Sequence, residues 1–262
     1  MILSWLRSRR RRAIAERPFP AVWGDILRRT VRQVDWLGDE ERARLQAWVA
    51  VFLAEKRFEG CGGMVVTDEV RLAVAGQVAL TAIGFEQAFY PMLTSILVYP
   101  RDYVVPKVHP IGGGAQLEWH EPRFGETWAG GSMVLSWPRV VEGGRMRDGP
   151  RSVVIHECAH LLDLADGEID GVPPLTGSTR AWAADMRACR DRFEAALDES
   201  RSTAFDEYAA ESDAEFFAVS SECFFQDPHR LVRHDAVLYA RLTEAWCQDP
   251  RQRVPPRDPR DR

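Results

Sequence analysis

The chain has 262 residues, which is enough to enclose a hydrophobic core in one large domain or two small ones. Apolar residues make up 45% of it and charged residues 28%, as is typical of globular proteins. The formal net charge of -5 argues against general nucleic-acid binding, which needs a basic surface, so we expect no direct nucleic-acid partner.

The N-terminal segment predicts neither secretion nor insertion into a membrane. Its apolar start, residues 1–6, is too short for the core of a signal peptide, and the basic run over residues 7–12 follows it rather than preceding it. No stretch approaches the ~18 apolar residues that a membrane span needs. The five cysteines lack C-x-x-C spacing, which is typical of free thiols in a reducing compartment. We therefore predict a cytoplasmic protein with no membrane partner.

The first half of the chain is predicted to be mainly helical. Residues 1–20 are expected to form a flexible basic tail, and residues 21–248 a single domain. Over residues 21–58 apolar side chains recur at helical spacing, and a glycine-rich break follows this stretch. A second helix is predicted over residues 69–83, which are apolar and rich in alanine.

The central part changes to β-type patterning and then returns to helices. Residues 95–100 and 132–138 are β-type runs that each end in a proline, and the glycines of residues 111–114 predict a loop between them. We predict an α+β fold, mostly helical with a small β-sheet. The remaining predicted segments are helices over 150–164, 179–199, 206–225 and 229–247, a loop over 165–178, and a disordered C-terminal tail over 249–262.

The pattern H-E-x-x-H occupies residues 156–160. On a helix, His156 and His160 project from the same face, so that their imidazoles can hold one zinc ion. Glu157 then lies beside the metal, where it can act on a metal-bound water. The alternative is a buried helix with two hydrogen-bonded histidines, each of which would need a polar partner. The strongly apolar neighbours of the pattern favour the metal site.

A catalytic zinc ion needs a third protein ligand. The extended signature, with a glycine three residues and a histidine six residues after His160, is absent, so a carboxylate from residues 206–225 is expected instead. Glu215 and Glu222 are the acids embedded in apolar sequence there. Glu215 could alternatively complete a capping box with Ser212. The residues alone leave the choice between Glu215 and Glu222 open.

Several separated motifs, in the same order, resemble those of the Mlc titration factor A (MtfA) family of zinc peptidases. The resemblance covers roughly residues 20–250. Its main motifs are His156-Glu157-x-Ala159-His160-x-Leu162-Asp163, Asp170-Gly171-x-Pro173, Tyr208-Ala209-Ala210 and Glu215-x-Phe217-Ala218-Val219.

The resemblance implies a cytoplasmic, zincin-like metallopeptidase of aminopeptidase type, related to the catalytic domain of the lethal-factor protease, with one zinc ion per chain. It places the third zinc ligand at Glu215 and a tyrosine that stabilises the transition state at Tyr208. Family members can also carry a further histidine near the metal. His120 is the nearest match, although its spacing to Gly125 is shorter than in the family pattern.

We therefore predict hydrolysis of peptide bonds in a peptide or protein substrate. Asp163 is expected either to accept a hydrogen bond from a ligand imidazole or to close its helix. The strand over residues 132–137 is expected to lie at a sheet edge, where it could bind the substrate backbone. The resemblance also implies a transcriptional repressor of sugar uptake as a partner. The alternative function is a regulatory binding protein that sequesters such a repressor, with a structural or vestigial zinc site.

Overall fold

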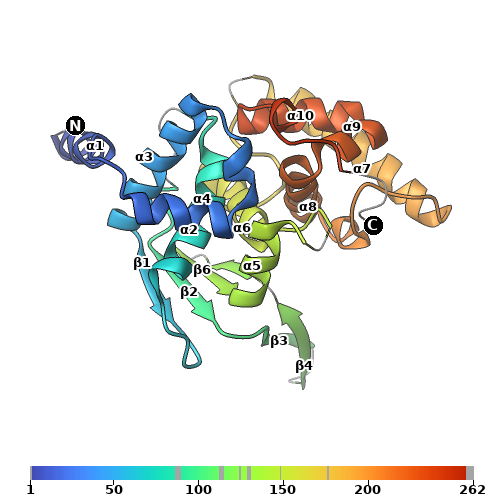
Figure 1. The fold of residues 1–262 in the computed structure, drawn as a ribbon. Helices are drawn as coiled ribbons and strands as arrows, with labels where there is room; N and C mark the ends of the chain where they lie inside the picture. The colour runs from blue at the N-terminus through green and yellow to red at the C-terminus, as the bar shows by residue number, and fades with distance from the viewer. Residues whose placement is uncertain are drawn as a thin grey trace.

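A computed structural model gives the fold of the chain (Figure 1). It describes residues 2–85, 90–111, 115–123, 125–128, 131–147, 149–175 and 177–257, and within residues 2–4 and 103–128 the description extends to the backbone alone. The α-helices are α1 (Ile2–Ala15), α2 (Ala21–Thr30), α3 (Asp39–Glu55), α4 (Asp68–Ala82), α5 (Trp137–Arg145), α6 (Val153–Asp163), α7 (Thr179–Asp198), α8 (Asp213–Gln226), α9 (Pro228–His234) and α10 (Ala236–Trp246). Shorter 3-10 helices are η1 (Arg32–Trp36), η2 (Leu164–Asp166), η3 (Glu207–Ala210) and η4 (Pro250–Gln252).

The strands form one small sheet and a separate hairpin. They are β1 (Arg57–Gly60), β2 (Ser95–Tyr99), β3 (Tyr103–Ile111), β4 (Ala115–Arg123), β5 (Gly125–Trp128) and β6 (Ser132–Ser136). The sheet has the order β1-β2-β6-β5, with β1, β2 and β6 parallel and β5 antiparallel to β6, while β3 and β4 pair with each other. The predicted α+β class, mostly helical with a small sheet, is confirmed.

Strand β6 does not lie at a sheet edge, so that prediction is wrong. Strand β2 pairs with one side of β6, and strand β5 pairs with the other, where Glu126 lies opposite Val134. The sequence did not predict β5 or the β3–β4 hairpin. Pro106 and Pro110 within β3 are residues that disfavour a strand, because proline cannot donate to a ladder of hydrogen bonds.

Two buried helices occupy the centre of the molecule. Figure 1 shows α4 and α6 there, with the sheet below them and helices α7 to α10 to the right. Helix α4 begins at the capping residue Thr67, whose hydroxyl accepts from the N–H of Val70, and most of its side chains are buried. Helix α6 contacts α4, β5, β6 and, on another side, α8. It therefore stands between the sheet and the C-terminal helices.

Serine and aspartate caps divide the C-terminal half into shorter helices than the sequence predicted. The predicted helix over residues 206–225 is interrupted, because Ser212 caps α8 by accepting from the N–H of Glu215. Asp235 interrupts the helix predicted over residues 229–247 in the same way, at the start of α10. Among the described residues, none of the helices combines the length and apolar character that crossing a membrane requires.

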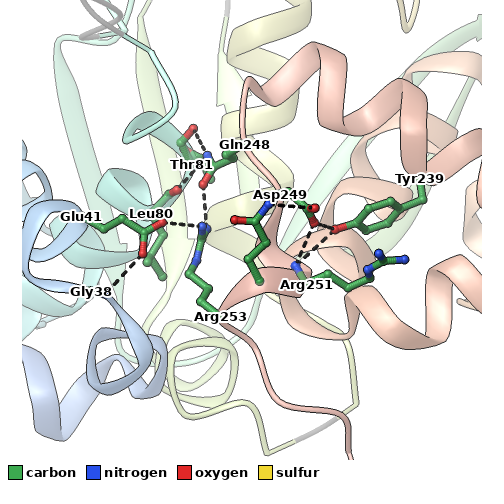
Figure 2. A network of polar contacts seen from close by, with 10 residues as sticks. Gly38, Glu41, Leu80, Thr81, Tyr239, Gln248, Asp249, Arg251 and Arg253 are labelled. Atoms are coloured by element: carbon green, nitrogen blue, oxygen red, sulfur yellow. Dashed lines mark hydrogen bonds and ion pairs between the residues drawn. The ribbon is translucent and has the colours of Figure 1, made fainter.

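Arginines within both predicted tails find acidic partners. Residues 2–15 form α1, and the Arg11 guanidinium makes two hydrogen bonds of 2.8 Å to Glu55 in α3. At the other end the Arg253 side chain is almost fully covered, binds Glu41 at 3.0 Å and donates to Gln248 (Figure 2). Residues 249–257 thus pack against the body of the protein, whereas 258–262 lie outside the described residues. That residues 21–248 form one domain stays a prediction.

Candidate metal centre

Helix α6 presents the two histidines of the H-E-x-x-H pattern side by side. Ser152 caps α6, and the apolar residues of this helix pack into the core. His156 and His160 lie on the remaining face and point toward each other's ring nitrogens. Their Nε2 atoms lie 3.1 Å apart, and the rings meet edge-on with centroids at 4.8 Å. Burial raises the pKa of Cys158, the neighbouring thiol, to about 12, and Cys158 is not among the residues whose ligand atoms converge at this point.

Glu215 reaches the same point from α8. One carboxylate oxygen lies 3.1 Å from His156 Nε2 and the other 3.6 Å from His160 Nε2. The Ser212 hydroxyl caps the helix as the capping box requires, but the Glu215 side chain extends to the histidines. The structure therefore brings together His156, His160 and Glu215, with their ligand atoms all within 4.8 Å of one another.

The donor atoms of these three residues lie close enough to share one metal ion. Ligands at 2.0–2.1 Å from a tetrahedral centre are about 3.3 Å from one another. The two Nε2 atoms are 3.1 Å apart, one Glu215 oxygen lies 3.1 Å from His156 Nε2, and the other Glu215 oxygen lies 3.6 Å from His160 Nε2. Among the described residues, the buried Oε2 of Glu215 also makes no well-aligned hydrogen bond. A metal ion would satisfy all three donors.

The electrostatics of the site favour positive charge. Burial lowers the pKa of the His156 imidazole, but the close carboxylates of Glu215 and Glu222 outweigh it and raise that pKa well above its usual value. Burial raises the pKa of Glu215, yet the two histidines outweigh it and bring the pKa far below the usual range. Glu215 is thus an anion at neutral pH, ready to bind a cation.

Glu222 orients His156 from the side opposite the metal centre. It is 8% exposed, and its Oε1 lies 2.9 Å from Nδ1 of His156 while its Oε2 accepts from the N–H of Ser152 at 2.6 Å. A carboxylate on Nδ1 keeps the proton there and leaves Nε2 free for a metal. The sequence offered Glu222 only as a ligand. The signal for its actual place is the seven-residue spacing from Glu215, which puts both acids on one face of α8.

Asp163 holds the loop that follows the motif helix. It is the last residue of α6, and its Oδ2 accepts from the N–H of Gly171 at 2.9 Å. No hydrogen bond joins it to an imidazole among the described residues, where Nδ1 of His160 is buried without a partner. Gly171 in turn touches the start of α8, because a Cβ there would lie 2.4 Å from the carbonyl oxygen of Asp213. The loop therefore ties the two ligand-bearing helices together.

The structure also places the remaining predicted residues. Glu157 is 2% exposed on α6, next to His156. Tyr208 lies on η3 and is 44% exposed, and its ring centroid is 6.3 Å from that of His156. The break at Ser212 removes the shared helix face expected for Tyr208, yet η3 keeps the tyrosine near the site. The backbone of His120 lies in β4, and its side chain is outside the described part of the chain.

An α+β fold in which two packed helices present two histidines and a glutamate to one point is typical of metallopeptidases. The chain belongs to the family described as glucose-regulated metallo-peptidase M90, whose profile matches residues 5–246. A metallopeptidase family implies a metal cofactor, and His156, His160 and Glu215 are placed to hold one.

Individual proteins similar in sequence match most of the chain. An uncharacterized protein of Synechocystis sp. is 33% identical over 245 residues, which cover 92% of this chain and 89% of the relative. Mlc titration factor A of Serratia proteamaculans is 28% identical over 238 residues, 89% of each chain. The protein of that name from Yersinia enterocolitica is 28% identical over 222 residues, 83% of this chain and 82% of the relative. The resemblance found in the sequence motifs is thereby confirmed.

Proposed function

We propose that this protein is a zinc-dependent peptidase of zincin type that holds one zinc ion per chain through His156, His160 and Glu215. The observation that carries the proposal is the convergence of these three side chains, whose ligand atoms lie within 4.8 Å of one another. The resemblance to the MtfA family supports aminopeptidase activity. The free state of all five cysteines supports a reducing, cytoplasmic compartment.

The residues around the centre have distinct tasks in the proposed hydrolysis. When bound, zinc supplies Lewis acidity that makes water a better nucleophile and polarises a peptide carbonyl. Glu157 accepts the proton of the attacking water and passes it to the nitrogen of the leaving amine. The hydroxyl of Tyr208 donates a hydrogen bond to the oxyanion. Glu222 keeps the Nδ1 proton of His156 in place throughout.

A second candidate function is the capture of a partner protein. The relatives from Serratia and Yersinia carry a name that describes them as titrating Mlc. By that resemblance the partner of this chain would be a transcriptional repressor of sugar uptake. An intact Glu157 favours catalysis, because a purely structural metal site has no use for a carboxylate at that place. The two functions can coexist in one protein.

The test compares zinc content and peptide hydrolysis in three proteins. We expect about one zinc ion per wild-type chain by mass spectrometry, and hydrolysis of substrates with a free amino terminus. The His160→Ala variant should lose both zinc and activity. The Glu157→Gln variant should keep its zinc and lose turnover by a factor of about 10² or more.

The outcomes separate the two candidate functions. Retained hydrolysis in Glu157→Gln would refute the role of Glu157 as the base. A wild-type protein that takes up no zinc on addition would refute the peptidase proposal. A protein that binds zinc and cleaves no peptide, with or without a free amino terminus, would favour partner capture.

A further inference from the structure

An open cavity with a basic lining lies away from the metal centre. Its volume is about 450 Å³, and it lies between the end of α2, the 3-10 helix η1 and the end of α5. Its lining residues are Arg28, Arg29, Arg32, Asp35, Arg145 and Arg147. We call it the arginine cavity. Residues of α6 and α8, the helices of the metal centre, are not among them.

A close contact between α2 and α5 builds the arginine cavity. A Cβ on Gly144 would lie 2.4 Å from the carbonyl oxygen of Thr30, so the two helices touch through their backbones at that point. Met146 then ends α5 with a left-handed backbone conformation, φ 54. The chain turns there, and Arg145 and Arg147 come to line the same space as the arginines of α2 and η1.

The lining carries far more positive than negative charge. Arg28 pairs with Asp25, and Arg29 has Glu69 at 3.8 Å, beyond hydrogen-bond distance. The Arg32 guanidinium lies 5.5 Å from the centre of the Trp36 ring. Among the described residues, Arg145 and Arg147 have no carboxylate within 4.0 Å, and neither does Arg32. Of the described residues that line the cavity, Asp35 alone is acidic.

The arginine cavity is positively charged, whereas the whole chain has a net charge of -5. Arginines that face a common space repel one another, and an anion among them removes that repulsion. Guanidinium groups bind phosphate oxygens through paired hydrogen bonds, and cavities that bind small ligands have volumes of roughly 300–1,000 Å³. We propose that the arginine cavity binds a small phosphorylated molecule.

Isothermal titration calorimetry with inorganic pyrophosphate, at low ionic strength, tests the proposal. We expect one saturable site per chain that weakens as sodium chloride is added, because salt screens exposed charges. The double variant Arg32→Ala/Arg147→Ala should bind at least about tenfold more weakly. The matched control is Arg180→Ala/Arg187→Ala, which removes the same charge from exposed positions on α7. It should bind like the wild type.

Two further variants complete the test. One shows whether pyrophosphate binds at the metal centre, and the other shows whether binding needs paired hydrogen bonds or charge alone. His160→Ala should keep its pyrophosphate affinity, because the expected site does not involve the metal centre. Arg32→Lys/Arg147→Lys keeps the charge but loses the paired geometry, so its affinity should fall between those of the wild type and the alanine variant. Absent binding, equal loss in both alanine variants, or loss in His160→Ala would each overturn the proposal.

Discussion

At the scale of single residues, a carboxylate outside the set of ligand atoms fixes the chemistry of the site. The Glu222 carboxylate forms a hydrogen bond of 2.9 Å with Nδ1 of His156, and it also accepts a hydrogen bond from the N–H of Ser152. This chain of contacts sets which imidazole nitrogen faces Glu215. Because the carboxylate also adds negative charge next to the ligand, it should raise the affinity of the site for a cation.

The Glu222→Gln variant tests this role. The amide keeps the size of the side chain but removes its charge, and its NH₂ group faces either the Ser152 N–H or the imidazole proton. We expect zinc affinity to fall by about 10- to 100-fold, as for other residues that support metal ligands. Competition against a fluorescent chelator measures it. Glu168→Gln, on the exposed loop after α6, is the control and should change nothing. Equal affinities in all three proteins would contradict the proposed role.

How far the site could be predicted follows from where its residues lie in the sequence. His156 and His160 sit about one helical turn apart, so their spacing alone predicts a shared face. The choice between Glu215 and Glu222 depends on how α8 packs against α6, which no local pattern encodes. Both acids reach His156, but on opposite ring nitrogens.

At the scale of elements, a buried lysine joins the end of α3 to the segment before β2. Lys56 donates to the carbonyl oxygens of Tyr90 at 2.8 Å and Leu93 at 2.7 Å. Burial lowers the pKa of Lys56 from 10.5 to about 8. Between these two pH values the unfolded chain keeps a proton that the folded protein has lost. The Lys56 contribution to folding stability therefore rises as pH increases from about 8 to about 10.5.

The pH dependence of urea unfolding checks this prediction. Wild-type protein should gain stability relative to Lys56→Met as the pH is raised through this window, and the difference between them should be flat below about pH 8. The variant will be less stable at every pH, because two buried carbonyl groups lose their donor. Parallel curves for the two proteins across the whole range would show that the pKa of Lys56 is not lowered.

The loop between η2 and α7 offers a second test at this scale. Gly171 has φ 78 and lies against the backbone of Asp213, whereas Gly167 has φ 105 and a Cβ added to it would meet nothing within 4 Å. Alanine strains the backbone at both positions, by about 1–3 kcal/mol. Only Gly171→Ala also pushes against the start of α8, so we expect it alone to weaken zinc binding. Equal zinc affinities in the two variants would contradict that coupling.

The sequence predicted the long helices well and the β region poorly. Helices α4, α6 and α7 each begin at a capping residue, and they lie within a few residues of their predicted bounds. The predicted helix over residues 206–225 failed at Ser212, where a local cap overrides a continuous apolar pattern. Strand β5 was missed because pairing with β6 creates it, and its four residues carry little signal of their own.

At the scale of the whole molecule, the donors of the metal centre come from distant parts of the chain. His160 and Glu215 are separated by 55 positions (215 − 160), and α6 rests on the sheet while α8 belongs to the C-terminal helices. Zinc binding should therefore stabilise the folded protein, which alone brings these donors together. Chelation should lower the unfolding temperature of the wild type and leave that of His160→Ala unchanged, as differential scanning calorimetry would show.

Because of the same separation in sequence, a bound metal ion would also hold α6 and α8 together. A metal ion shared by α6 and α8 would act as a removable cross-link that closes the long segment between them, as a disulfide closes a loop. Hydrogen exchange in α8 should quicken when that link is removed, because the helix then depends on packing alone. A chain without zinc would thus lose both the cross-link between α6 and α8 and the proposed catalytic activity. Metal supply would set how long the protein survives proteolysis as well as how fast it works.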